Sequence, residues 1–333
     1  MNKFLGILLA GILGIQGCGD DPVKPQADAN TNNETKVSDP LPKSEEKTKD
    51  KATDEQSSAA EDYTPALWKI EHQGKTSYLF GSVHMGDKSM YPLPQVVTEA
   101  YQSSDALAVE IDLGNINQMA IAQKVQQMAI DPNNSLESVL KEKTLVEYNE
   151  YCEETKSPCK MFSSFEPWFA AMTLEALNMQ QSGYSEQYGV DMYFLDQARK
   201  DKEIVELESI DFQLEALDGM PLELQDAFLY SVVTKSEDEN DKLIKAWKSG
   251  EVEAYVENSF EEAKESGIDE EDYQYFMELL LYNRNQGMAD GIAEHIEQGK
   301  SVFAVVGAAH YGGDKSVNYY LEEKGFSVER IDY

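Results

Sequence analysis

The sequence predicts an α/β fold: a mixed sheet with a parallel core, assembled from the N- and C-terminal parts of the chain, with a large helical insertion between them. Three observations lead to this prediction. Short runs of β-prone residues alternate with amphipathic segments at both ends of the folded part, which is typical of parallel crossover units. The stretch between them, about residues 115–290, has mainly helical periodicity. Two predicted strands also end in the same motif, Gly-x-x-His.

The N-terminal part of the fold begins with two β-rich runs that flank Gln73 and Gly74, within residues 67–84. This pattern predicts a hairpin, because such dipeptides suit tight turns between strands. A helix over residues 93–105, with Pro94 near its start, precedes a continuous apolar strand over residues 106–112. Strand, helix and strand in this order predict a right-handed parallel crossover.

The C-terminal part repeats the same alternation. Its predicted elements are a helix over 189–202, a strand over 203–209, a helix over 287–298, a strand over 301–310, a helix over 316–324 and a last strand over 326–332. Gly299 and Gly325 end two of these helices. Between the two ends, residues 166–182 form a clear helix and residues 221–282 contain further amphipathic helices. The sheet therefore draws strands from both ends of the chain.

The first 62 residues are predicted to lie outside the folded domain. Lys3 precedes a short apolar core, and Cys18 directly follows Gly17, a pattern that resembles a bacterial lipoprotein signal. We expect residues 1–17 to be a signal peptide, Cys18 to be lipidated and residues 18–62 to be a disordered polar tether. An ordinary signal peptide with a chance cysteine is the alternative. Residues 63–333 then form a single domain in the bacterial cell envelope, lipid-anchored at the periplasmic face of the outer membrane.

The net charge narrows the classes of partner. The chain carries 28 basic and 62 acidic residues, a net charge of −34, which would repel a phosphate backbone and excludes nucleic acid as an expected partner.

Cys152 and Cys159 are the only cysteines after Cys18. Export to an oxidising compartment favours a disulfide between them, and Pro158 favours the turn that closes it. The sequence does not fix an oligomeric state.

The candidate site lies where four predicted strands end. His84 and His310 complete the two Gly-x-x-His motifs, and Glu110 and Glu208 end two other strands. Because ligands bind outside the carboxyl ends of parallel strands, we expect these four side chains to meet at one edge of the sheet. Two imidazoles and two carboxylates are suitable ligands for a divalent metal, Mn²⁺, Co²⁺ or Zn²⁺. The same set also suits metal-free acid–base chemistry.

Three further polar residues, Arg284, Asp191 and His295, lie outside this set of four. Arg284 would either clamp a substrate carbonyl or carboxylate, or pair with acidic residues nearby. Asp191 is either an acid at the start of a helix or a partner of the site residues. His295 is expected to be exposed on a helix and not a ligand.

Taken together, these stretches resemble the TraB/GumN family, relatives of the Tiki proteins, from about Trp68 to the C-terminus. The resemblance rests on the motifs LFGSVHMGD, ALAVEID, EPWFAAM, GVDMYFLDQA, VELES and VVGAAHYGGDKSV. It implies that His84 and His310 are the active-site signature, with Glu110, Glu208 and Arg284 at the family's other polar positions. Tiki proteins are described as metal-dependent proteases, and the wider superfamily is similar to erythromycin esterases and a haem-binding lipoprotein group.

The leading functional hypothesis is a metal-dependent hydrolase that acts on peptide bonds, with His84, Glu110, Glu208 and His310 as metal ligands. Arg284 would orient the substrate or stabilise the oxyanion. A metal-free esterase-type hydrolase of a small molecule is the second hypothesis, and a non-enzymatic binder of peptide or haem is the third.

Overall fold

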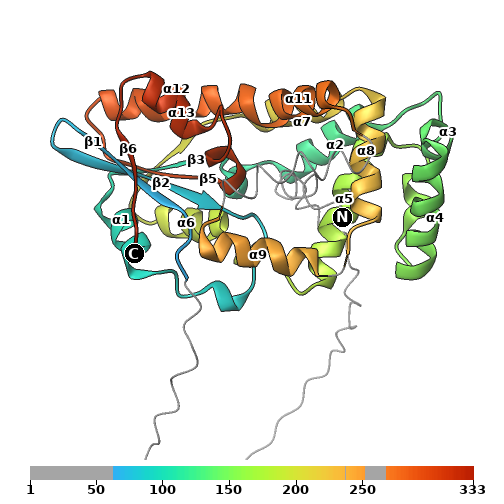
Figure 1. Ribbon diagram of the computed structural model, residues 1–333, viewed down its shortest axis with the longest axis horizontal. Helices are drawn as coiled ribbons and strands as arrows, with labels where there is room; N and C mark the ends of the chain where they lie inside the picture. The colour runs from blue at the N-terminus through green and yellow to red at the C-terminus, as the bar shows by residue number, and fades with distance from the viewer. Residues whose placement is uncertain (1–62, 237, 252–267) are drawn as a thin grey trace, which may run out of the picture. The chain divides into compact units, whose positions relative to one another are not determined.

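The computed structural model of the protein describes residues 63–236, 238–251 and 268–333 (Figure 1). The predicted signal peptide, lipidated Cys18 and tether lie outside these residues, as does part of the predicted helical region, residues 252–267. Within the described part, none of the helices is both long and apolar enough to cross a membrane.

A six-stranded mixed sheet forms the centre of the fold, as predicted. Its strands, in order across the sheet, are β4 (Glu203–Glu206), β3 (Ala106–Val109), β5 (Val302–Gly307), β2 (Lys75–Ser82), β1 (Leu67–His72) and β6 (Val328–Arg330). β4, β3, β5 and β2 are parallel, and β1 runs antiparallel to both β2 and β6. β5, from the C-terminal part, lies between two strands from the N-terminal part.

The predicted hairpin joins β1 to β2. Its two turn residues, Gln73 and Gly74, have φ angles of 49° and 78°. Positive φ at both central residues is the type I′ geometry that matches the twist of the flanking strands. Glycine reaches this region without the steric cost of a β-carbon, so the sequence of the turn suits its geometry.

Helices cover both faces of the sheet. They are α1 (Gln95–Ser103), α2 (Gln118–Ala129), α3 (Leu136–Val139), α4 (Glu142–Thr155), α5 (Pro167–Gln181), α6 (Val190–Ala198), α7 (Ile210–Asp218), α8 (Leu222–Val233), α9 (Glu239–Ser249), α11 (Glu270–Met277), α12 (Asn283–Glu297) and α13 (Val317–Glu323). Apolar residues of α1, α6 and α9 pack on one face of the sheet, and those of α12 and α13 pack on the other (Figure 1). This burial of both faces explains why the two inner parallel strands, β3 and β5, carry no polar side chains.

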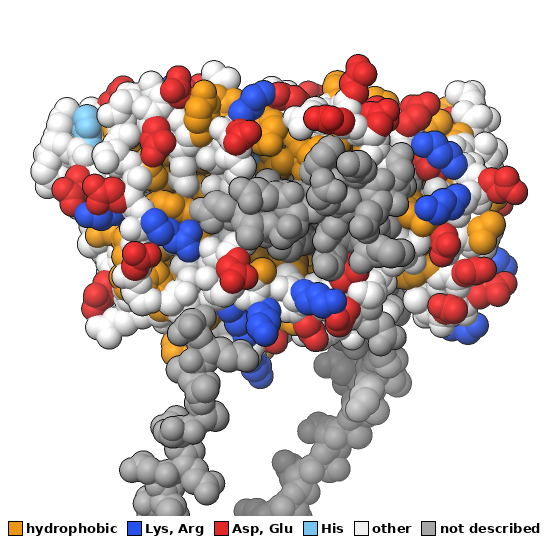
Figure 2. Space-filling view, in the orientation of Figure 1, with side chains coloured by type: hydrophobic (Ala, Val, Ile, Leu, Met, Phe, Trp, Pro, Cys, Tyr) orange, Lys and Arg blue, Asp and Glu red, His pale blue; other side chains and the backbone are white. Residues whose placement is uncertain are grey.

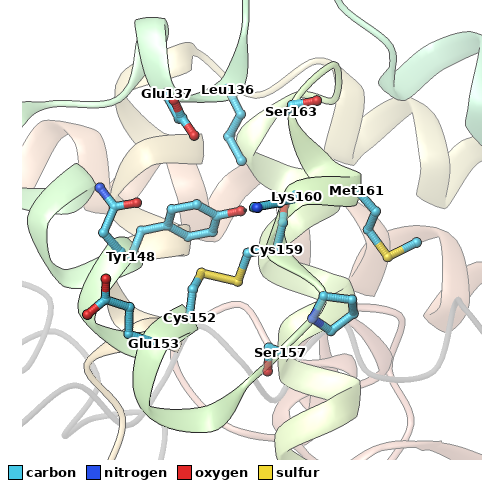
Figure 3. Close-up of a pocket in the computed structure, with 12 residues that line it drawn as sticks. Leu136, Glu137, Tyr148, Cys152, Glu153, Ser157, Cys159, Lys160, Met161 and Ser163 are labelled. Atoms are coloured by element: carbon cyan, nitrogen blue, oxygen red, sulfur yellow. Dashed lines mark hydrogen bonds between the residues drawn. A yellow bond between two sulfur atoms is a disulfide. The ribbon is translucent and has the colours of Figure 1, made fainter.

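The helical insertion has a hydrophobic core of its own. Residues of α2, α4, α5, α8 and α11 form one apolar cluster around the fully buried Trp168. At its margin Cys152 and Cys159 are joined by a disulfide, and the hydroxyl of Tyr148 donates to the carbonyl of Cys159 at 3.0 Å. A groove of about 590 Å³ lies beside the disulfide (Figure 3). The bond therefore ties the end of α4 to the chain that leads into α5.

The disulfide stabilises the insertion by restricting the unfolded chain. Replacing both cysteines by alanine is expected to lower the free energy of unfolding by about 2 kcal/mol, because the bond closes only a short loop. Urea unfolding followed by circular dichroism measures this change. An unchanged unfolding midpoint in the double variant would contradict it.

Candidate active site

The two Gly-x-x-His motifs lie next to each other because β2 and β5 are adjacent parallel strands. Gly81 aligns with Val306, and Ser82 aligns with Gly307. A β-carbon on Gly81 would lie 3.1 Å from the β-carbon of Ala308, so the two strand ends approach closely only because that side chain is missing. The repeated motif thus reflects two neighbouring strands that end at one place.

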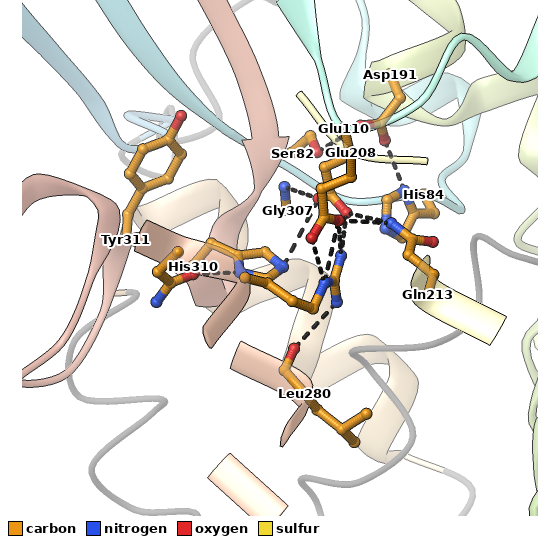
Figure 4. A network of polar contacts seen from close by, with 12 residues as sticks. Ser82, His84, Glu110, Asp191, Glu208, Gln213, Leu280, Gly307, His310 and Tyr311 are labelled. Atoms are coloured by element: carbon orange, nitrogen blue, oxygen red, sulfur yellow. Dashed lines mark hydrogen bonds and ion pairs between the residues drawn. The ribbon is translucent and has the colours of Figure 1, made fainter. Parts of the chain in front are cut away.

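The two predicted carboxylates follow the next two strands in the same order. Glu110 directly follows β3, and Glu208 comes two residues after β4. The backbone N–H of Glu208 donates to the carbonyl of Glu110 at 2.9 Å. Across β4, β3, β5 and β2 the strand ends therefore carry Glu208, Glu110, His310 and His84. These side chains gather at one edge of the sheet (Figure 4).

Arg284 on α12 joins the two carboxylates. Its Nη2 donates to Oε2 of Glu110 and to Oε2 of Glu208, both at 2.7 Å, and its Nε donates to Oε1 of Glu208 at 3.0 Å. Its Nη1 donates to the carbonyl of Leu280 at 3.0 Å. Leu280 belongs to a π-helical turn, η5 (Glu278–Tyr282), that leads into α12. Each nitrogen of the guanidinium is thus occupied by a protein group, which makes Arg284 a positioning residue for the carboxylates.

Gln213 on α7 also holds both carboxylates. Its Nε2 donates to Glu110 at 3.2 Å and to Glu208 at 3.0 Å. Gln213 was not among the predicted site residues, because a single glutamine on an amphipathic helix carries no recognisable spacing signal. Only its position five residues after Glu208 connects it to a site residue along the chain.

His310 is buried and held by Asn285. Its Nδ1 lies 2.5 Å from Oδ1 of Asn285, while Nδ2 of Asn285 donates to the carbonyl of Lys315 at 2.7 Å. Because the amide presents its oxygen, Nδ1 of His310 carries the proton and Nε2 keeps a lone pair. Nε2 lies 3.8 Å from Oε1 of Glu110. Burial and the nearby charge of Arg284 lower the pKa of His310 to about 3, so this imidazole is neutral.

His84 has the opposite electrostatic environment. Its Nδ1 lies 3.0 Å from Oδ2 of Asp191, and the hydroxyl of Ser82 donates to Oδ1 of Asp191 at 2.8 Å. Burial lowers the pKa of His84, but the charge and hydrogen bond of Asp191 outweigh it and raise the pKa to about 9. Asp191 is therefore a partner of a site residue, one of the two roles that the sequence left open. At neutral pH His84 is an imidazolium.

Gly307 leaves one open point, about the size of a methyl group, between the side chains of the site. A β-carbon there would lie 3.1 Å from Oε1 of Glu110, 3.5 Å from Cδ2 of His310 and 3.9 Å from Nε2 of His84. The backbone N–H of Gly307 donates to Oε1 of Glu110 at 2.7 Å. Both imidazoles and one carboxylate therefore surround a single point that any larger residue would fill.

Glu110 is an ionised carboxylate despite its burial. Burial raises its pKa, but the charge that His310 gains at acidic pH, the permanent charge of Arg284, the charge of His84 and the Gly307 hydrogen bond lower it to about 2. This buried negative charge faces both imidazoles.

The predicted set of four metal ligands does not fit a divalent ion in this arrangement. Both oxygens of Glu208 accept from Arg284, and Oε2 of Glu110 accepts from the same guanidinium. A permanent cation thus occupies the place between the carboxylates, and a second cation there would be repelled. Among residues 63–236, 238–251 and 268–333, no group of three or more His, Cys, Asp and Glu side chains is arranged to hold an ion.

Two other polar residues lie outside this network. Asp112, two residues beyond Glu110, forms a salt bridge with Arg199. His295 is half-buried on α12, and its Nδ1 lies 2.9 Å from the carbonyl of Gly291 within the same helix. It is less exposed than expected, because this nitrogen faces the preceding turn.

Comparison with known proteins shows to which family the chain belongs. The profile of the TraB/PrgY/gumN family matches residues 66–330. The chain belongs to this family. It is similar to the uncharacterised protein YbaP of Shigella flexneri, with 28% identity over 249 residues, 74% of this chain and 87% of that protein. YbaP of Escherichia coli strain K12 is 27% identical over 248 residues, 73% of this chain and 87% of that protein. No solved structure matches.

Loss of Arg284 should destabilise the folded protein, because it leaves two buried carboxylates without a counter-charge. Arg284→Met is expected to lower the free energy of unfolding by about 3–5 kcal/mol. Adding Glu110→Gln and Glu208→Gln to this variant should recover more than half of the loss, since the buried charges are then gone. Lys242→Met is the control, because Lys242 and its partner Asp238 are both exposed and such an ion pair contributes little to stability. Urea denaturation measures all three variants, and equal losses from Arg284→Met and Lys242→Met would contradict the assignment.

The raised pKa of His84 should make stability fall with rising pH. Between the ordinary value of 6.5 and about 9, the folded state holds a proton that the unfolded state has lost. The resulting stabilisation is complete below pH 6.5 and disappears as the pH rises through 9; at most it amounts to about 3 kcal/mol.

Asp191→Asn should flatten this dependence, because it removes the charge that raises the pKa of His84. Asp196→Asn, an exposed position on the same helix α6, should keep it. Chemical denaturation at pH 6 and pH 9 measures the slope. The interpretation is contradicted if Asp191→Asn and the wild type lose the same stability.

Proposed function

We propose that the protein is a hydrolase of carboxylic acyl bonds, peptide or ester, with His310 as general base and His84 as general acid. One observation supports this most directly. Two imidazoles face one open point, and their surroundings shift their pKa values in opposite directions, to about 3 and about 9. Paired titratable groups with divergent pKa values are the usual basis for dividing acid and base roles in an active site.

The reaction follows from these protonation states. Nε2 of neutral His310 takes a proton from water while the water oxygen bonds to the substrate carbonyl carbon. The imidazolium of His84 then gives its proton to the leaving nitrogen or oxygen as the bond from the carbonyl carbon to that atom breaks. The products are a carboxylic acid and an amine or alcohol. The proton gained by His310 replaces the one lost by His84 through solvent, which restores the starting state.

The carboxylates assist this reaction through charge. Glu110 lies close to both imidazoles and stabilises the positive charge that develops on His310 as it takes the proton. Asp191 holds the ring of His84 and keeps Nε2 directed at the open point. Arg284 and Gln213 fix Glu110 and Glu208, so the donors and acceptors are in place before a substrate binds.

A metal-dependent peptidase, the leading hypothesis from the sequence, remains a testable alternative. It would require the guanidinium of Arg284 to withdraw from at least one carboxylate. Export, lipid anchoring at Cys18 and attachment to the periplasmic face of the outer membrane are further proposals, which rest on the pattern around Lys3 and Cys18. A peptide or small molecule is the proposed substrate, and the net charge of −34 argues against nucleic acid.

Assays on purified protein test the proposed chemistry. Hydrolysis of a peptide library and of aryl esters is measured with and without EDTA, and with added Mn²⁺, Co²⁺ or Zn²⁺. We expect activity that survives chelation and falls at least about a hundredfold in His310→Ala and in His84→Ala, the usual scale for a lost acid–base group. Activity that appears only with an added ion would support the metal-dependent alternative. Activity unchanged in both histidine variants would place the chemistry elsewhere.

Gly307→Ala tests whether the open point is where the substrate reacts. The new methyl group would press on Glu110 and fill the space between the imidazoles, so hydrolysis should fall at least about tenfold with folding retained. Gly287→Ala is the matched control, because Gly287 is exposed on α12 and a β-carbon there meets no atom within 4 Å. Equal activities of the two variants would show that the space beside Gly307 is not used.

A further inference from the structure

The disulfide between Cys152 and Cys159 lies on the wall of the groove in the helical insertion (Figure 3). Both cysteines line this groove, and its volume of about 590 Å³ is in the usual range for a site that holds a small molecule or a short piece of peptide. Cys152 is partly exposed, whereas Cys159 is only 9% exposed. A reagent that enters the groove therefore reaches Cys152 first.

Hydrogen bonds hold the chain between the two cysteines in place independently of the disulfide. The hydroxyl of Thr155 donates to the carbonyl of Tyr151 at 2.8 Å, and the N–H of Ser157 donates to the hydroxyl of Thr155 at 3.2 Å. The N–H of Cys159 donates to the carbonyl of Ser157 at 2.8 Å, and the hydroxyl of Tyr148 donates to the carbonyl of Cys159 at 3.0 Å. The α-carbons of the two cysteines are 6.0 Å apart. These contacts should keep the two sulfur atoms close together when the bond between them is open.

This closeness decides which class of thiol can open the bond. A thiolate that attacks the sulfur of Cys152 expels Cys159 as a thiolate and forms a mixed disulfide with Cys152. Because Cys159 stays beside Cys152, its thiolate attacks the mixed disulfide and expels a reagent that has a single thiol. A dithiol escapes this reversal, since its second thiol attacks the mixed disulfide from the reagent's side and closes a disulfide within the reagent.

The charges on the groove wall favour Cys159 as the sulfur that leaves. Of the described residues that line the groove, Lys160 alone is basic, and it follows Cys159 in the 3-10 turn η3 (Cys159–Phe162). The acidic lining residues, Glu137 and Glu153, belong to α3 and α4. A nearby ammonium group stabilises a thiolate, whereas a carboxylate does not. The positive charge thus lies on the segment that carries Cys159.

We propose that the disulfide between Cys152 and Cys159 is a site of reversible reduction by a protein dithiol, which attacks Cys152 from the groove. The disulfide gains two electrons and two protons and becomes two thiols, while the two thiols of the partner lose them and become a disulfide. The partner is defined by this chemistry: two neighbouring cysteines on a segment narrow enough to enter the groove. The domain stays folded in the reduced form, because the hydrogen bonds around the two cysteines and the core around Trp168 do not depend on the bond.

Three reductants at equal thiol concentration test the proposal on the folded protein without denaturant. The full chain carries Cys18→Ser, so that Cys152 and Cys159 are its only cysteines. Thioredoxin is the protein dithiol, dithiothreitol is the small dithiol and 2-mercaptoethanol is the single thiol. Free thiols are counted after acid quenching by the mass shift of a maleimide label. Thioredoxin and dithiothreitol should release two thiols at least about tenfold faster than 2-mercaptoethanol, with an unchanged circular dichroism spectrum.

Three results would overturn the proposal. A bond that stays closed until urea unfolds the chain would be a structural link that reagents do not reach. Reduction by dithiothreitol but not by thioredoxin would exclude a protein as the partner. Equal rates with one-thiol and two-thiol reagents would show that Cys159 does not remain beside Cys152 after the first attack.

Two charge variants test which sulfur is attacked. Lys160→Glu places a carboxylate next to the leaving sulfur of Cys159, so thioredoxin should reduce the bond at least about threefold more slowly. Lys156→Glu is the matched control, because Lys156 lies between the two cysteines, is exposed and does not line the groove. It makes the same change in net charge and should keep the rate of the parent chain. The same rate in both variants would contradict attack at Cys152 with Cys159 as the leaving group.

Discussion

The contact between Arg284 and the two carboxylates is the interaction on which the site depends. Glu110 and Glu208 end two neighbouring parallel strands, and their side chains are withdrawn from water. Like charges placed together in a region of low polarity repel, so the arrangement is stable only with a cation between them. A guanidinium meets this need because it can donate to both carboxylates at once. It also ties α12 and its π-helical turn to the end of the sheet.

This ion network explains why two chemically identical side chains are in different states. His310 faces Arg284 and is enclosed by protein, and both effects favour its neutral form. His84 lies against Asp191, whose charge is not neutralised by a guanidinium, so its protonated form is favoured. The difference comes from the distribution of the surrounding charges, since the two residues occupy equivalent positions in equivalent motifs. The two histidines have equivalent places at the edge of the sheet, but α6 brings Asp191 to His84 and α12 brings Arg284 to the side of His310.

Prediction from the sequence succeeded where a pattern is local. The hairpin at Gly74 follows from turn chemistry, and the strands that precede His84, Glu110, Glu208 and His310 follow from runs of apolar residues with defined ends. Because parallel strands end at a common edge, four residues far apart in the chain could be assigned to one site. Gln213 and Asn285 were missed, because an amide on a helix has no distinguishing periodicity. Their roles depend on which helix face meets the sheet, which is decided by packing.

The sequence alone determined the α/β class, the two motif-bearing strands and the residue types available for chemistry, because these follow from periodicity and from the order of elements. Only the tertiary structure decided that β5 inserts between β2 and β3, and that Arg284 reaches the carboxylates instead of facing outward. The protonation states of His84 and His310 were likewise undetermined by sequence. The physical reason is that a charge's energy depends on its distance from other charges and from water, and those distances are created when separate helices pack against the sheet.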